Sequence, residues 1–140
     1  MCDGTVTGSI KVRFAPRAAT SWHAARSAVG MHAALESLNR AWEADGRGPL
    51  AMGVAVHTGL VFAGTLGAPR KKKYAVLGDT VNLTSRMEGL NRDLGTGILI
   101  SGAALAALRD RVVVRDRGRV AVKGRREPVD IHELLSLEEG

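Results

Sequence analysis

The sequence has 140 residues, a length that fits one domain with a single hydrophobic core. Apolar residues make up 45% of the chain, which excludes an intrinsically disordered protein. The net charge of +6 suits a polyanionic partner such as a nucleic acid, a membrane surface or a nucleotide phosphate. Most basic residues are spread along the chain, apart from clusters at 70–73 and 123–126, so charge alone does not choose among these partners.

Cysteine content and hydropathy restrict the cellular setting. Cys2 is the one cysteine, which excludes an intrachain disulfide and a cysteine-based metal cluster. No apolar run approaches the roughly 18 residues that a membrane helix requires. The first residues lack the basic region and apolar core of a signal peptide. We therefore expect a soluble, cytoplasmic protein with no membrane segment.

The first half of the chain predicts a strand, a long helix and two further strands. Apolar residues alternate over 10–14, as in a half-buried strand. A helix is expected over 20–45, and its apolar stripe contains Ala28, Met31, Leu35, Leu38 and Trp42. Strands are expected over 50–56 and 60–66, and the short turn at 57–59 predicts that they form an antiparallel hairpin.

The second half predicts an amphipathic helix between short strands. After a basic loop at 67–73 and a strand at 74–77, Asp79 or Thr80 can cap the first N–H groups of a helix. Its apolar stripe contains Leu83, Met87, Leu90 and Leu94, and Gly95 follows where a C-terminal glycine belongs. A strand, a helix and a strand pair complete the chain, at 98–100, 103–108, 112–122 and 129–134. Antiparallel pairs mixed with helices indicate an α+β fold in one domain over 1–140.

One face of the second helix carries two groups suited to phosphate recognition. Asn82 and Arg86 are four residues apart, so their side chains lie one turn apart on the same face. A guanidinium binds oxyanions through a planar fork, and an amide beside it can hydrogen-bond an adjacent sugar oxygen. On spacing alone, a solvated helix face is the commoner explanation of such a pair.

Three other polar features are expected to be structural. His57 is expected to hydrogen-bond in its turn and not to act as a catalytic base. Asp79 is expected to cap its helix and not to bind a metal ion. The basic run at 70–73 is expected to be a solvated loop, although contact with a partner or with phosphates is an alternative.

A specific motif changes the weight given to Asn82 and Arg86. Residues 78–89 read Gly-Asp-Thr-Val-Asn-Leu-Thr-Ser-Arg-Met-Glu-Gly, which resembles the signature helix of class III adenylate and guanylate cyclases. Further segments resemble that family in its own order, at 53–59, 63–64, 98–101 and 122–129. The resemblance runs from about 23 to 135 and implies a ferredoxin-like nucleotidyl cyclase fold.

The resemblance also implies a reaction. In this family the 3′-hydroxyl of a nucleoside triphosphate attacks its own α-phosphate and pyrophosphate leaves, with two Mg²⁺ or Mn²⁺ ions held by two aspartates. By motif position, Arg86 would meet charge on the α-phosphate, Asn82 would orient the ribose, and Lys123 would contact the terminal phosphates. The family's sites lie between two domains, so these residues would act with a homodimeric or heterodimeric partner.

The resemblance breaks down at the metal-binding end. The family's first metal aspartate lies on an opening strand that would precede this chain, so we expect a truncated fold that lacks its first strand. Asp3 is the one carboxylate before Glu36, and a lone carboxylate cannot hold two divalent ions. We therefore expect no metal ligands here. ATP is expected more than GTP, although Ala75 at a base-selecting position has no hydrogen-bonding group.

Three hypotheses remain open at this point. The first is a shortened adenylate, or less readily guanylate, cyclase domain that is inactive as a homodimer. The second is a regulatory or pairing half that lends Asn82, Arg86 and Lys123 to a metal-holding partner. The third is a basic nucleic-acid-binding module, which lacks the expected aromatic stacking pairs and glycine-rich phosphate clamp. A missing inner strand would also leave an unpaired apolar edge, which predicts marginal stability, dimerisation or aggregation.

Overall fold

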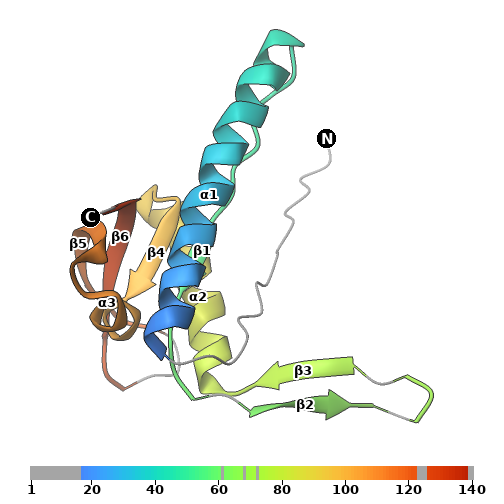
Figure 1. Ribbon diagram of the computed structural model, residues 1–140, viewed down its shortest axis with the longest axis vertical. Coiled ribbons are helices and arrows are strands. Elements are labelled where there is room, and N and C mark those ends of the chain that lie inside the picture. The colour runs from blue at the N-terminus through green and yellow to red at the C-terminus, as the bar shows by residue number, and fades with distance from the viewer. Residues whose placement is uncertain (1–16, 61, 68, 72, 123–125, 139–140) are drawn as a thin grey trace.

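The computed structural model describes residues 17–60, 62–67, 69–71, 73–122 and 126–138. A four-stranded sheet lies between helices, and a two-stranded hairpin extends away from it (Figure 1). The elements in chain order are α1 (Arg17–Ala44), β1 (Val54–Val56), β2 (Phe62–Leu66), β3 (Lys73–Leu77), α2 (Asp79–Leu94), β4 (Ile98–Ser101), α3 (Gly102–Leu108), the short 3-10 helix η1 (Arg109–Arg111), β5 (Val112–Val120) and β6 (Val129–Leu137). The strand expected over 10–14 lies outside the described residues.

The main sheet has the strand order β1-β4-β6-β5. β1 runs parallel to β4, whereas β6 pairs antiparallel with both β4 and β5. This mixture of pairings with helices confirms the α+β class, and the pairing of the last two strands confirms the expected terminal pair. The β5–β6 register shifts at two places, and Gly118 at the second adopts a positive φ of 80°.

Helices cover both faces of the sheet because its central strand is apolar on both sides. All four residues of β4 are buried. Ile98 and Ile100 face the cluster that includes residues of α1 and α3, whereas Leu99 faces α2. Successive side chains of a strand point to opposite faces, so the short apolar run fills two cores at once.

The predicted hairpin between the strands at 50–56 and 60–66 is wrong. β1 contains residues 54–56 alone and pairs with β4, while β2 pairs antiparallel with β3. After β1 the chain does not turn back to pair with that strand. His57 hydrogen-bonds Ser101 at the end of β4, and the Leu60 carbonyl accepts a hydrogen bond from Thr80 of α2. β2 and β3 form the actual hairpin; Arg70 and Lys71 of the basic run lie between the two strands, and Lys73 begins β3.

The helix boundaries agree with the sequence more closely at C-termini than at N-termini. Gly95 ends α2 in the left-handed region, with φ 66°, as expected for a C-terminal glycine. The predicted cap by Asp79 or Thr80 is wrong, because the N-cap residue is Gly78, which has no side chain that could cap the helix. Thr80 instead directs its hydroxyl to Leu60.

The long helix α1 confirms the helix expected over 20–45, and its far end extends beyond the sheet (Figure 1). Ala28 on its stripe is buried, whereas Leu38 is exposed because no sheet lies beneath that part of the helix. None of the helices in the described segments has the length and apolar character needed to cross a bilayer.

Candidate nucleotide-binding site

Helix α2 presents Asn82 and Arg86 on its exposed face. Both side chains are exposed and lie one turn apart, as their spacing predicts. On the opposite side, Leu83 and Met87 are 2% and 0% exposed. The buried stripe holds the helix on the sheet, and the polar pair is left accessible to a ligand outside this subunit.

Polar side chains on α2 also fasten the helix to its surroundings. Asn91 is 4% exposed, and its Nδ2 donates to the carbonyls of Val54 (3.0 Å) and Glu88 (3.1 Å). Its Oδ1 accepts a hydrogen bond from the Thr96 hydroxyl at 2.8 Å. At the other end, the Thr80 hydroxyl donates to the Leu60 carbonyl at 2.7 Å. The sequence reasoning did not identify either anchor.

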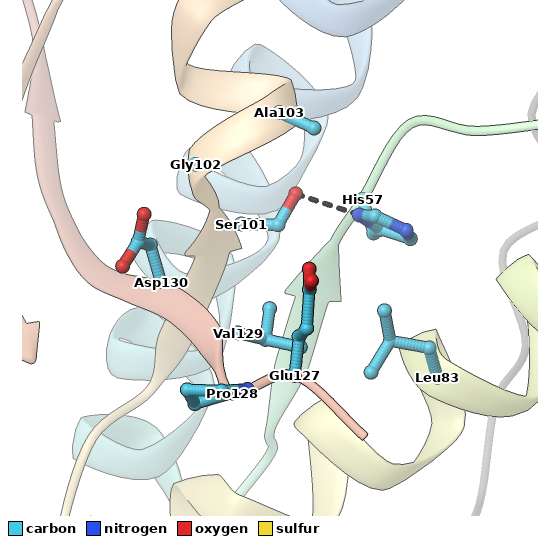
Figure 2. A pocket seen from close by; sticks show the side chains of 9 residues that line it. All are labelled: His57, Leu83, Ser101, Gly102, Ala103, Glu127, Pro128, Val129 and Asp130. Atoms are coloured by element: carbon cyan, nitrogen blue, oxygen red, sulfur yellow. Dashed lines mark hydrogen bonds between the residues drawn. The ribbon is translucent and has the colours of Figure 1, made fainter. Parts of the chain in front are cut away.

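A pocket of about 230 Å³ opens where β1 and β4 end and β6 begins. Its lining residues come from several elements: His57, Leu83, Ser101, Gly102, Ala103, Glu127, Pro128, Val129 and Asp130. Figure 2 shows His57 and Ser101 pointing toward one another, and their Nδ1 and Oγ atoms are 2.7 Å apart. Ser101 Oγ also accepts a hydrogen bond from the Ala104 N–H at 3.2 Å. His57 does form a hydrogen bond, as expected, but its partner is Ser101 at the end of β4 and not a residue of its own turn.

The charges around this pocket disfavour a nucleotide phosphate. The Glu127 side chain extends toward the His57–Ser101 pair, and Asp130 lies on the other side of Ser101 (Figure 2). Asp130 is paired with Arg119 at 2.9 Å on the surface. Two carboxylates that line the pocket would repel a phosphate bound inside it. α2 contributes Leu83 to the lining and neither Asn82 nor Arg86, so that pair does not line this pocket.

The remaining expected groups are not brought to Asn82 and Arg86 by the described part of the chain. Lys123 and Asp3 lie outside the described residues. Within the described ranges, no three His, Cys, Asp or Glu side chains are grouped closely enough to hold a metal ion. The family's ions are held by two aspartates, and residues 4–16, where the resemblance places the second of them, contain no acidic residue and lie outside the described ranges.

Comparison with known proteins decides the family. The model of the adenylate and guanylate cyclase catalytic domain matches residues 5–136. This chain belongs to that family. The cyclase domain is 39% identical over 115 residues to adenylate cyclase 1 of Rhizobium meliloti (strain 1021), which covers 82% of this chain and 17% of the relative.

Solved structures agree with the family assignment. The adenylyl cyclase CyaB from P. aeruginosa has 28% identity and a TM-score of 0.75, covering 86% of this cyclase domain and 61% of that chain. The guanylyl cyclase Cya2 has 38% identity and a TM-score of 0.72, covering 83% and 59%. These matches confirm the ferredoxin-like nucleotidyl cyclase fold. The cyclase domain thus spans about three-fifths of each solved relative and a smaller share of the Rhizobium protein.

Proposed function

We propose that this cyclase domain supplies Asn82, Arg86 and Lys123 to a nucleotide site that it shares with a second cyclase domain. The observation that carries the proposal is the exposed Asn82–Arg86 pair on the anchored helix α2, in a chain of the cyclase catalytic family. The partner would hold the Mg²⁺ or Mn²⁺ ions of the family, since residues 4–16 of this chain lack the acidic residue that the resemblance places there.

The chemistry required of these side chains is electrostatic and positional. In the proposed reaction the ribose 3′-hydroxyl loses its proton to solvent and its oxygen bonds to the α-phosphorus. The bond from that phosphorus to the oxygen that bridges to the β-phosphate breaks, and pyrophosphate leaves. Arg86 would stabilise the charge that develops on the α-phosphate oxygens, and Asn82 would hold the ribose so that its 3′-oxygen is in line. A preorganised group of this kind contributes about 3–4 kcal/mol to the transition state.

The β2–β3 hairpin supports a paired arrangement. It extends away from the main sheet (Figure 1), and an isolated two-stranded hairpin is marginally stable in water. Leu60, which precedes β2, and Leu77, the last residue of β3, are 87% and 53% exposed. Burial of these side chains against a second domain would stabilise both the hairpin and the pair. The productive partner is a different, metal-holding cyclase domain in a heterodimer, whereas a homodimer of this chain would bury the hairpin without forming cyclic nucleotide.

The substrate is proposed to be a nucleoside triphosphate, ATP in preference to GTP, in the cytoplasm. Adenylate cyclases from Rhizobium meliloti, Dictyostelium discoideum and Anabaena cylindrica are among the relatives. A guanylate cyclase subunit from Rattus norvegicus is also similar, which keeps GTP as the alternative base.

Complementation tests the proposal. The purified chain is mixed with an intact cyclase whose own Asn/Arg pair has been replaced by alanine, and cyclic AMP is measured. Activity should appear in the mixture and fall roughly 10²–10³-fold with Arg86→Ala. Arg92→Ala is the matched control, because Arg92 is exposed on the same helix but points in another direction.

Two results would count against lending of these residues. Activity that survives Arg86→Ala would show that Arg86 does not serve the site. Cyclic nucleotide formation by the chain alone would contradict the need for a metal-holding partner. Inhibition of an intact cyclase without rescue would support the alternative, a regulatory half that occupies the partner unproductively.

A further inference from the structure

The side of β1 that faces α2 is built from small residues. Ala55 packs in the cluster that contains Leu83 and Met87 of α2, whereas Val54 and Val56 pack in the cluster that includes α1. Gly53 precedes the strand and Gly59 follows it. Small side chains on this face let the helix approach the strand closely. However, such small side chains interlock only weakly with the helix. They do not prevent the helix from sliding along the strand, because apolar packing is non-directional.

A directional contact holds the N-terminal end of α2. The Thr80 hydroxyl donates to the Leu60 carbonyl at 2.7 Å. A Cβ on Gly59 would lie 2.6 Å from Thr80 Oγ1 and 2.8 Å from its Cγ2. Glycine therefore provides the space in which the threonine reaches the chain after β1.

A second directional contact holds the C-terminal end. Asn91 Nδ2 donates to the Val54 carbonyl at 3.0 Å. A Cβ on Gly53 would lie 3.2 Å from Asn91 Cβ and 2.7 Å from the Glu88 Oε1 atom. Each end of α2 thus has one hydrogen bond to the backbone around β1, made beside a glycine.

We infer that Thr80 and Asn91 are positioning residues that fix the register of α2 on the sheet, and through it the places of Asn82 and Arg86. The inference rests on the proposed function of that pair. Both site residues lie between the two anchors, and Asn82 is two positions from Thr80. Loss of the Thr80 contact should therefore displace the ribose-binding group most. A displacement of about 1 Å at a reacting centre lowers the rate roughly 100-fold.

Thr80→Val separates positioning from folding. Valine keeps the shape and removes the hydroxyl, and the carbonyl that it leaves belongs to an exposed residue that water can reach. In the complementation assay we expect kcat to fall roughly 10- to 100-fold with KM for ATP and the melting temperature unchanged. Thr80→Ser should restore the rate. Thr84→Val is the matched control, because the Thr84 hydroxyl bonds the Thr80 carbonyl within α2.

Hydrogen exchange gives a readout that does not depend on activity. Amides at 81–86 should exchange faster in Thr80→Val than in the unaltered chain, and Thr84→Val should leave them unchanged. Gly59→Ala should produce the same loss of rate although the hydroxyl is still present. Unaltered exchange in Thr80→Val, or a rate equal to that of Thr84→Val, would overturn the inference. If Thr80→Val exchanges faster but the unaltered chain does not complement the partner cyclase, the positioning role would stand and the proposed function would be rejected.

Discussion

Asn91→Ala is expected to destabilise the fold because it leaves a buried strand carbonyl without its side-chain donor. The Val54 carbonyl receives its hydrogen bond from Asn91 in a region where Asn91 is 4% exposed. That carbonyl keeps its ladder bond to β4, because Val54 pairs in parallel with Ile98, so the cost is that of the hydrogen bonds that Asn91 itself makes. Each contributes about 0.5–1.5 kcal/mol, so loss of the bonds to Val54 and Thr96 costs about 1–3 kcal/mol.

Urea unfolding followed by circular dichroism measures this cost. Asn39→Ala is the matched control, because Asn39 also makes two hydrogen bonds, with the carbonyl and N–H of Leu50, at 2.9 and 2.8 Å. Those bonds lie near the surface, where water replaces them, so the expected cost is about 0.5–1.5 kcal/mol. Equal costs for the two variants would refute the argument that burial makes Asn91 important.

Three further outcomes are expected. Gly97→Ala should destabilise by about 1–3 kcal/mol, because a Cβ there would lie 2.7 Å from the His32 ring, whereas Gly30→Ala in open space on α1 should stabilise by about 0.5–1 kcal/mol in the same melts. Sedimentation of the isolated chain should show self-association, and a monodisperse monomer that unfolds sharply would contradict it. Binding to nucleic acid should be absent, and steeply salt-dependent binding would revive the basic-module hypothesis.

The sequence predicted α2 well because its signals are local. The helical spacing of Leu83 and Met87 and the glycine at position 95 lie within one segment, and both kinds of signal were confirmed. The Asn82–Arg86 pair followed from the same spacing. The N-cap was mistaken because the Thr80 hydroxyl bonds a residue outside the helix, which local capping patterns do not reveal.

Strand partners and polar anchors were harder to predict because they depend on distant contacts. β1 pairs with β4, which lies beyond a hairpin and a helix, so the tight turn at 57–59 misleadingly favoured β2. Asn91 did leave a signal. It follows Leu83 and Met87 at steps of four, so it is a polar residue on the buried stripe. A polar group at such a position requires a hydrogen-bonding partner.

Among the strands that the structure describes, β1 and β5 lie at the two sides of the sheet and differ in how well they would pair with a further strand. β5 carries the charged residues Arg115, Asp116, Arg117 and Arg119. Its ladder is interrupted near Gly118, whose N–H donates to the Asp116 carboxylate at 2.7 Å. Charges and bulges of this kind discourage further pairing. β1 is uncharged and regular. Among the described strands, β1 is therefore expected to offer the less protected border to a further strand, whereas β5 disfavours one.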